Sequence, residues 1–219
     1  MTIHIDGQDY TFSRPISVEN FIKQEGLSPN ALLATVNDKA VDLDYVIQDD
    51  ATIKTITRRD ELGKKVYNHT ASHVLAQAVK SIFPTVKLAT GPAIDGGFYY
   101  DFDFKTQPDV EDLERIEAEM MRIIKADLPM KREEVSREEA VKIMLGFQET
   151  YKLELISEIS KDEVISLYRQ GDFVDLCQGP HLKSTGLIKG VKLISMTGVY
   201  WRGNKRNKML TRIYGVTID

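Results

Sequence analysis

The sequence predicts an α+β protein in which antiparallel sheets pack against separate helices. Short runs of alternating apolar and polar residues are joined by tight-turn signals such as Asp6-Gly7, which is typical of antiparallel hairpins. Amphipathic stretches follow Ser17, Asp109 and Ser136. They predict helices, because Ser and Asp side chains accept hydrogen bonds from the first free backbone N–H groups of a helix.

Residues 1 to about 60 predict a small domain of their own. We expect a hairpin, a helix between Ser17 and Gly26, a second hairpin and a last strand, the strands lying within residues 3–12, 32–43 and 53–56. This order of elements is that of a ubiquitin-like β-grasp fold. The stretch 57–65 is polar and charged, and we place a domain boundary within it. The expected domains are residues 1–62 and 63–219.

The larger domain is expected to combine antiparallel strands with packed helices. Aromatic and polar residues alternate from Phe98 to Phe104, which predicts a half-buried strand. Residues 151–156 are compatible with a strand or a helix. Helices are expected over residues 109–127 and 136–145, and further strands over residues 173–177, 191–195, 199–202 and 209–217.

The composition indicates a soluble globular protein. Hydrophobic residues make up 42% and charged residues 28% of the 219 residues, and no apolar run approaches the ~20 residues that cross a bilayer. The stretch from Met1 to Asp6 has neither the basic start nor the apolar core of a signal peptide. The only cysteine, Cys177, cannot form an internal disulfide, which suits a reducing compartment. We therefore expect a cytoplasmic protein.

Charge is unevenly distributed along the chain, whose net charge is −4. Residues 109–163 hold sixteen acids and nine bases, a net charge of −7, whereas residues 176–218 hold eight bases and no acid. The basic end is consistent with a local surface that binds a polyanion. It is equally consistent with an ordinary surface whose counter-charges come from the acidic segment, and both interpretations stay open.

His69 and His73 lie in a stretch that predicts a helix as far as Phe83. Residues four apart on a helix are one turn apart, so both rings can reach one point in space. The expected apolar stripe is Tyr67, Ala71, Val74, Leu75, Ala78 and Ile82. The histidines fall nearly opposite this stripe, close to Ala76. We therefore expect them on a polar face, either on a plain solvated surface, which the helix alone favours, or in a cleft.

Cys177 and His181 repeat the same spacing far downstream, with Gly179-Pro180 turning the chain between them. The residues themselves leave two interpretations open. Three imidazoles and a thiolate could hold a tetrahedral zinc ion. The same groups could instead form a hydrolytic site, with imidazoles as general acid and base, a thiol nearby and Asp175 orienting one ring.

Several segments resemble the bacterial threonyl-tRNA synthetase family, and the resemblance covers the whole chain. They are Asn68-His69-Thr70-Ala71-Ser72-His73, Gly96-Gly97-Phe98-Tyr99-Tyr100-Asp101, Asp175-Leu176-Cys177-Gln178-Gly179-Pro180-His181, Tyr200-Trp201-Arg202-Gly203 and Leu210-Thr211-Arg212-Ile213-Tyr214-Gly215. Residues 1–62 look like the TGS domain of that family, and residues 63–219 look like its editing domain, with the second additional domain at about 165–219. The last segment is similar to the one that leads into the family's aminoacylation core. Because the chain stops there, we expect a fragment that edits and does not aminoacylate.

The resemblance implies that the chain hydrolyses the aminoacyl ester of tRNA(Thr) mischarged with serine. The catalytic residues it implies are His69, His73, Cys177, His181 and Lys152. The substrate-binding residues it implies are Asp175, Tyr100 and Gly91, and the candidates for contacts with tRNA phosphates are Lys205, Arg206 and Lys208. One of the first two histidines would act as base, and the thiol would position water rather than form an acyl-enzyme. The resemblance implies no metal or other cofactor.

Two other functions are compatible with the sequence. Alanyl-tRNA editing proteins share both four-residue pairs and usually hold zinc on them. One alternative is therefore a zinc-dependent trans-editing hydrolase with zinc at His69, His73, Cys177 and His181, although the TGS-like module and the synthetase-like ending count against it. The other is a non-catalytic tRNA-binding or regulatory module. We expect no membrane partner and a monomer, because the family dimerises mainly through the part that this chain lacks.

Overall fold

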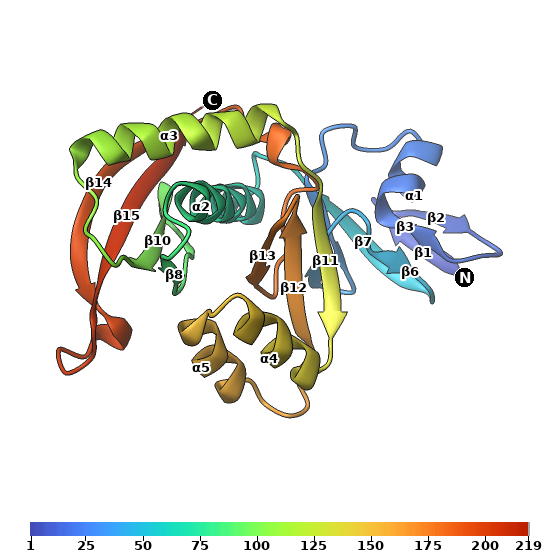
Figure 1. The fold of residues 1–219 in the computed structure, drawn as a ribbon. Helices are drawn as coiled ribbons and strands as arrows, with labels where there is room; N and C mark the ends of the chain where they lie inside the picture. The colour runs from blue at the N-terminus through green and yellow to red at the C-terminus, as the bar shows by residue number, and fades with distance from the viewer. Residues whose placement is uncertain (219) are drawn as a thin grey trace. The chain divides into compact units, whose positions relative to one another are not determined.

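The computed structural model describes residues 1–218 and has the predicted α+β class, with antiparallel sheets and separate helices (Figure 1). The chain forms two compact units. The first unit comprises Met1–Tyr67 together with the short segment Gly179–Lys183. The second unit comprises residues 68–178 and the chain from Ser184 onward.

The first unit is built on a five-stranded sheet in the order β2-β1-β7-β4-β5. Its strands are β1 (Thr2–Ile5), β2 (Gln8–Thr11), β4 (Leu33–Val36), β5 (Lys39–Val41) and β7 (Ala51–Ile56). β1 and β7 run parallel, and the other neighbours are antiparallel. A separate two-stranded sheet pairs β3 (Ile16–Ser17) with β6 (Val46–Ile47). Both predicted hairpins are confirmed.

Helix α1 (Val18–Gln24) begins where the sequence predicts, because the Ser17 hydroxyl accepts a hydrogen bond from the Asn20 N–H. Gly26 follows the helix with a φ of +64°, a conformation that glycine adopts without steric cost. Phe21 is fully buried and makes edge-to-face ring contacts with Tyr10 and Phe12. These rings anchor α1 in the core of the first unit.

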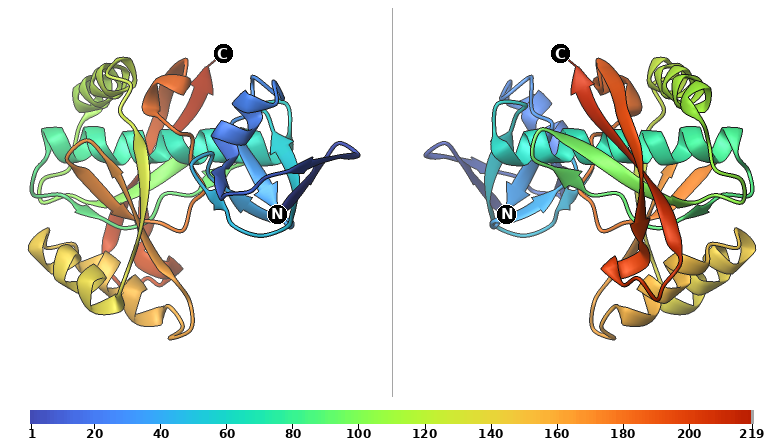
Figure 2. Two further views of the ribbon diagram at one scale, coloured as in Figure 1. Left: turned by 90° about the vertical axis from the view of Figure 1, so that its right-hand side faces the viewer. Right: turned by 90° about the vertical axis from the view of Figure 1, so that its left-hand side faces the viewer.

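The larger sheet of the second unit has the order β14-β15-β10-β8, with β9 paired to β10. Its strands are β8 (Lys87–Leu88), β9 (Ala93–Ile94), β10 (Gly97–Asp103), β14 (Gly190–Tyr200) and β15 (Met209–Ile218). The last two form the long antiparallel ribbon drawn in red and orange-red in Figure 2. The prediction of two strands over 191–195 and 199–202 is wrong, because one strand, β14, runs from Gly190 to Tyr200 with a register shift between Leu193 and Ser195. Trp201 and Arg202 lie in a 3₁₀ turn.

The second unit also contains an antiparallel sheet in the order β11-β12-β13 and three outer helices. These are β11 (Met130–Val135), β12 (Ile165–Gln170), β13 (Phe173–Leu176), α3 (Val110–Lys125), α4 (Arg137–Gly146) and α5 (Thr150–Glu158), with short 3₁₀ turns η1 (Thr185–Leu187) and η2 (Trp201–Gly203). The ambiguous residues 151–156 are helical and belong to α5. Within residues 1–218, no helix combines the length and the apolar character needed to cross a lipid bilayer.

The caps predicted for α3 and α4 are confirmed. Asp109 and Asp112 form a capping box, in which each side chain accepts a hydrogen bond from the backbone N–H of the other residue. The Ser136 hydroxyl accepts from the Glu139 N–H at the start of α4. Local side-chain chemistry therefore sets where both helices begin.

Helix α2 (Glu61–Ile82) lies between the two sheets of the second unit in its part from Asn68 onward (Figure 1). From the larger sheet, the Thr217 hydroxyl donates to the Asn68 side chain. From the smaller sheet, the Gln170 amide donates to the backbone carbonyl of His73. Because sheets cover two sides, every residue over 68–79 except His69 and Gln77 is buried.

The polar face expected on α2 is therefore wrong. Ala76 has 0% exposure and His73 has 3%, although both were expected opposite the apolar stripe. The stripe itself packs inward, but the opposite side is covered as well, by strands β12 and β13 that come about a hundred residues later in the chain. From the helix alone we favoured a plain solvated surface for both histidines, and this prediction is wrong for His73.

Replacing Ala76 with lysine is expected to lower the free energy of unfolding by at least about 2 kcal/mol, because an ammonium would enter a site without solvent. Ala118, an exposed alanine on α3, is the matched control, and Ala118→Lys should change stability by less than about 0.5 kcal/mol. Urea denaturation measures both. Equal stability of the two variants would contradict the burial of this side of α2.

Candidate functional site

The two histidines of α2 face each other across one helical turn. Their ring centroids lie 5.1 Å apart, with the ring planes at 78°. His73 is buried and His69 is half-buried. The spacing predicted from the sequence therefore does bring both imidazoles to one place inside the second unit.

Cys177 lies beside the two histidines, at the end of a strand of the β11-β12-β13 sheet. It directly follows β13, and its Sγ lies 3.6 Å from Nε2 of His69. The potential ligand atoms of His69, His73 and Cys177 all lie within 4.8 Å of one another. His181 lies in the segment Gly179–Lys183 of the first unit, where its backbone N–H donates to Oδ1 of Asp42 at 2.7 Å.

A buried charged cluster lies beside the histidines. The Lys152 ammonium on α5 is 2.8 Å from Oδ1 of Asp175 on β13. It also donates to the hydroxyl of Tyr100 on β10 at 2.8 Å, and that hydroxyl donates to Oδ2 of Asp175 at 2.7 Å. Nδ1 of His73 lies 3.6 Å from the same Oδ2. The lysine, the aspartate and the tyrosine are at most 3% exposed.

Burial and charge fix the protonation states of this cluster. Burial lowers the pKa of His73 to about 4, against the opposing charge of Asp175. Burial alone would raise the pKa of Asp175, but the Lys152 charge, assisted by His73 and by hydrogen bonds, holds it below its ordinary value. Burial, and then the Asp175 charge, raises the pKa of Tyr100 well above its ordinary value. At neutral pH the site therefore contains a carboxylate, a neutral imidazole and a protonated phenol.

Gly91 and Tyr100 pack directly against each other. A Cβ on Gly91 would lie 2.0 Å from Cδ2 of the Tyr100 ring. The Ser72 hydroxyl on α2 fixes the same loop, because it lies 2.6 Å from the Gly91 carbonyl oxygen and 2.7 Å from that of His69. The ring and the loop therefore leave no space for one more carbon atom between them.

Sequence analysis missed two residues that support the site. Ser72 ties the Gly91 loop to α2. Gln170 is buried on β12 and donates both to the His73 carbonyl at 3.1 Å and to the Gln77 side chain at 2.7 Å. A serine and a glutamine carry no distinctive motif, and Gln170 lies 97 residues from its histidine. No local pattern could have connected them.

The three residues of the second unit have the donor types of a zinc site. A tetrahedral zinc ion, with Zn–S of about 2.3 Å and Zn–N of about 2.0 Å, would place a sulfur and a nitrogen ligand about 3.5 Å apart. The separation of the Cys177 Sγ and His69 Nε2 atoms is 3.6 Å. His69 and Cys177 therefore have the separation of two ligands of one zinc ion, while the same groups also suit a metal-free hydrolytic site.

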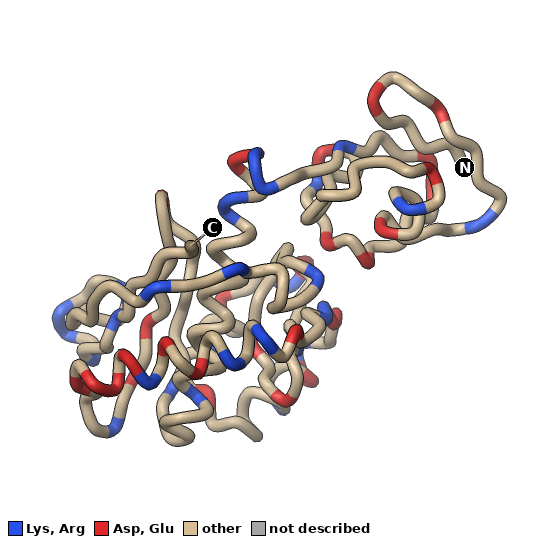
Figure 3. Tube along the Cα trace, turned by 90° about the horizontal axis from the view of Figure 1, so that it is seen from above, with Lys and Arg blue, Asp and Glu red and all other residues tan. Residues whose placement is uncertain are grey.

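Most bases of the C-terminal segment have acidic partners. Ion pairs join Lys183 to Glu19, Lys192 to Glu117, Arg202 to Glu154 and Glu158, Lys208 to Asp103, and Arg212 to Asp101. Accordingly, basic and acidic positions are interspersed along the second unit in Figure 3. Of the three candidate phosphate contacts, Lys205 and Arg206 are exposed and form no ion pair within residues 1–218. Lys208 is exposed but paired.

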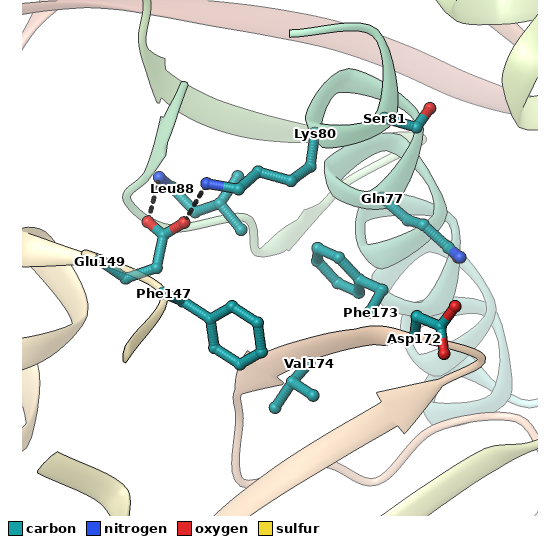
Figure 4. Close-up of a pocket in the computed structure, with 9 residues that line it drawn as sticks. All are labelled: Gln77, Lys80, Ser81, Leu88, Phe147, Glu149, Asp172, Phe173 and Val174. Carbon is teal, nitrogen blue, oxygen red and sulfur yellow. Dashed lines mark hydrogen bonds and ion pairs between the residues drawn. The ribbon is translucent and has the colours of Figure 1, made fainter. Parts of the chain in front are cut away.

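A separate cavity of about 270 Å³ lies at the C-terminal end of α2 (Figure 4). Its apolar side is formed by Leu88, Phe147, Phe173 and Val174. Two of its charged groups pair with each other, because Glu149 accepts from the Lys80 ammonium at 2.5 Å, and Glu149 also accepts from the Leu88 N–H at 2.8 Å. This cavity contains none of the residues that the sequence predicts to be functional.

The chain is similar in sequence to tRNA synthetases. Residues 165–214 match the family model of the threonyl and alanyl tRNA synthetase second additional domain. The chain is 54% identical over 193 residues to a threonine–tRNA ligase of Desulforamulus reducens, which covers 88% of this chain and 30% of that protein. It is 50% identical over 214 residues to the threonine–tRNA ligase of Acetivibrio thermocellus, which covers 97% of this chain and 34% of that protein.

A threonine–tRNA ligase of Clostridioides difficile is 49% identical over 216 residues, with 98% of this chain and 34% of that protein covered. The chain thus spans about a third of the length of these curated relatives. These matches confirm the resemblance to threonyl-tRNA synthetases that the sequence motifs indicated.

The pH dependence of stability should report the buried His73. Between about pH 6.5 and pH 4 the His73 imidazole is protonated in the unfolded state but not in the native state. The free energy of unfolding therefore falls as the pH falls through this window. A depression of this size corresponds to about 3 kcal/mol, with no further change from this group below pH 4. Denaturation of the wild type and of His73→Gln at both pH values measures the difference. Identical losses in the two proteins would contradict a depressed pKa.

Gly91→Ala should destabilise the protein by about 1–3 kcal/mol, because the new methyl group overlaps a ring held by two hydrogen bonds. Gly146 at the end of α4 has open space where its Cβ would lie, so Gly146→Ala should leave stability unchanged or slightly raised. Thermal unfolding of both variants distinguishes them. The contact between Gly91 and Tyr100 would be disproved by a fully stable Gly91→Ala protein.

Proposed function

We propose that this chain edits aminoacyl-tRNA by hydrolysing the ester of tRNA(Thr) that carries serine. The observation behind this proposal is one cluster. Two imidazoles and a thiol lie beside a buried lysine–aspartate–tyrosine group, in a chain related to threonine–tRNA ligases. We further propose that the first unit is a TGS-type β-grasp domain. Its five-stranded sheet, with β1 parallel to β7 and α1 in its core, supports that assignment.

The chemistry of serine and threonine explains why such a site would be needed. Serine lacks one methyl group of threonine, and a missing methyl changes binding in a pocket by only ~1–3 kcal/mol. A synthetic site alone would therefore charge some tRNA(Thr) with serine. A second site that admits serine and excludes threonine removes the error. The tight contact between Gly91 and Tyr100 suits a wall that excludes the extra methyl.

Hydrolysis requires attack by water on the ester carbonyl carbon and cleavage of the bond to the ribose oxygen. The proton from water passes to a base and then to the leaving ribose oxygen. With a pKa near 4, His73 is a weak base, so we assign it to holding the water or the ribose hydroxyls. The half-buried His69 is then the base, and Cys177 beside it positions the water.

The charged groups have complementary roles in the proposal. The Asp175 carboxylate binds the ammonium group of serine, because its lowered pKa keeps it ionised. The Lys152 ammonium, in a buried site of low dielectric, stabilises the oxyanion that forms on the ester carbonyl. On the basis of the sequence pattern alone, we also assign His181 as a second proton-transfer or orienting group.

The partner in this proposal is the acceptor arm of a tRNA. Lys205 and Arg206 lie in the exposed turn between η2 and β15 and are free of acidic partners within the described chain, so they can neutralise phosphates. Lys208 ranks behind them, because binding a phosphate would require it to leave Asp103. Such contacts would position the RNA without reading its sequence.

A zinc-dependent hydrolase is the second candidate, and one observation favours it. The Cys177 sulfur and the His69 nitrogen have the separation expected of two ligands of one zinc ion. When bound, zinc would lower the pKa of a coordinated water and so supply hydroxide. His69, His73 and Cys177, with His181 as a fourth residue from the sequence, would hold it.

Deacylation of seryl-tRNA(Thr) by the purified chain tests the function. The wild type should release serine, and His69→Ala should be slower by a factor of about 100 or more, as for the loss of a general base. His4→Ala is the matched control, because His4 is exposed and paired with Asp9 on the first unit. The control should keep full activity.

The same assay separates the two candidates. Activity that survives exhaustive chelation supports the metal-free site, whereas activity lost on chelation and restored by zinc supports the metal site. A wild-type chain that binds tRNA but never releases serine faster than buffer, with or without zinc, would rule out both.

A further inference from the structure

Trp201, at the start of the turn between β14 and β15, packs against helix α5. Trp201 is 8% exposed, and its ring lies edge-to-face against Tyr151 with the ring centroids 5.0 Å apart. The indole N–H donates to a carboxylate oxygen of Glu154 at 3.0 Å. Both partners belong to α5, one residue before and two residues after Lys152. Trp201 therefore contacts the helix at positions that flank this buried lysine.

The packing around the Trp201 ring is continuous with the core of the second unit. Trp201, Tyr151, Ala89 and Leu210 form one buried apolar cluster, with Leu155 of α5 packed against it. The next residue, Arg202, pairs with Glu154 and Glu158 on the outer side of α5. These ion pairs are partly exposed, and pairs of that kind contribute little to stability. The buried ring is therefore the firmer of the two attachments between this turn and α5.

The turn that follows Trp201 carries Lys205 and Arg206, the exposed cations that we assign to tRNA phosphates. Hydrogen bonds close this turn through the backbone of Trp201. Its N–H donates to the Lys208 carbonyl at 3.0 Å, and its carbonyl accepts from the Asn207 side chain at 2.9 Å. Neither bond involves the indole. The backbone of Trp201 thus shapes the turn, whereas its side chain attaches the turn to α5.

The proposed reaction requires a constant spacing between these two places. A tRNA held at Lys205 and Arg206 must present its ester carbonyl to the Lys152 ammonium, and a misplacement of about 1 Å can slow a reaction by about a hundredfold. A lysine side chain is flexible, so the position of its ammonium depends on the helix that carries it. The Trp201 ring lies between that helix and the turn with the two cations.

We propose that Trp201 is a positioning residue for Lys152: its side chain holds α5 against the turn that contacts tRNA phosphates, so that the oxyanion-stabilising ammonium and the RNA contact keep a fixed spacing. This inference rests on the proposed function, which assigns those roles to Lys152, Lys205 and Arg206. In it, Trp201 touches neither the substrate nor the reacting atoms. Its role requires a flat apolar ring, so phenylalanine should largely replace it and alanine should not.

Deacylation of seryl-tRNA(Thr) by the whole chain measures the catalytic consequence. The kcat of Trp201→Ala should fall by a factor of about 10 to 100, because Lys152 is no longer held in place. The KM should change less than about threefold, because the backbone bonds that close the turn remain. Trp201→Phe retains the ring contact with Tyr151 and should keep a kcat within about threefold of the wild type. The assay is run where circular dichroism shows each variant to be folded.

Hydrogen exchange tests the attachment of α5 without reference to catalysis. In Trp201→Ala, the amides of Leu155 and Ile156 on α5 should exchange at least about tenfold faster than in the wild type, and that of Ile123 on α3 should not change. Should Trp201→Ala not fold, Trp201→Leu takes its place in both measurements, because leucine keeps apolar volume but has neither the flat ring nor the N–H.

Tyr200→Ala is the matched control, since Tyr200 is the neighbouring aromatic residue and is 41% exposed. It should match the wild type in kcat and in exchange. The proposal is wrong if Trp201→Ala has the kcat of this control, if its loss lies in KM rather than in kcat, or if Trp201→Phe is equally impaired. A folded wild-type chain that does not deacylate contradicts the proposed function instead, while unchanged exchange in α5 of Trp201→Ala would show that Trp201 does not hold the helix.

Discussion

The buried ion pair between Lys152 and Asp175 is the interaction on which the second unit depends. Both groups are almost completely removed from water, and each alone would be a large electrostatic penalty. Together with the Tyr100 hydroxyl they compensate one another, and they join α5, β13 and β10 at a single point. The groups to which we assign catalytic roles and a structural junction thus share the same atoms. The helix, the small sheet and the large sheet can assemble only in the arrangement that also completes the site.

The surroundings of α5 show how firmly Lys152 is placed. At the helix start, the Glu149 carboxylate accepts bonds from Lys80 and from the Leu88 backbone. One turn further, the Trp201 indole donates to Glu154. At the end of the helix, the Arg137 guanidinium donates to the carbonyls of Ile156, in the last turn, and of Ile159 and Ser160, just after it. These contacts fix the backbone from which the long lysine side chain extends toward the cluster.

Local chemistry explains which features the sequence could predict. Ser17, Asp109 and Ser136 begin helices because their oxygens bond to backbone groups two or three residues away, and that information is contained in the motif itself. The pairing of His69 with His73 follows from helical geometry alone. Their burial could not be predicted, because the strands that cover them come about a hundred residues later. The role of Gln170 could not be predicted for the same reason, and Ser72 belongs to no motif that indicates its contact with Gly91. Residues 176–218 hold eight bases and no acid, so a basic surface and an ordinary paired surface were equally compatible with the sequence. The acids that pair with several of these bases, Asp101, Asp103 and Glu117, lie in segments distant in sequence.

The path of the chain through the two units affects which recombination events such a gene tolerates. The chain leaves the second unit after Gln178, spends five residues in the first unit and returns at Ser184. The first unit is consequently encoded in two separate stretches of the gene. A recombination event that replaces only the stretch for residues 1–67 would supply a new turn around position 42 while leaving the old residues 179–183 opposite it. Exchange of this unit between related genes is thus neutral only when both stretches are compatible, and changes in one stretch should be correlated with changes in the other through the history of the lineage.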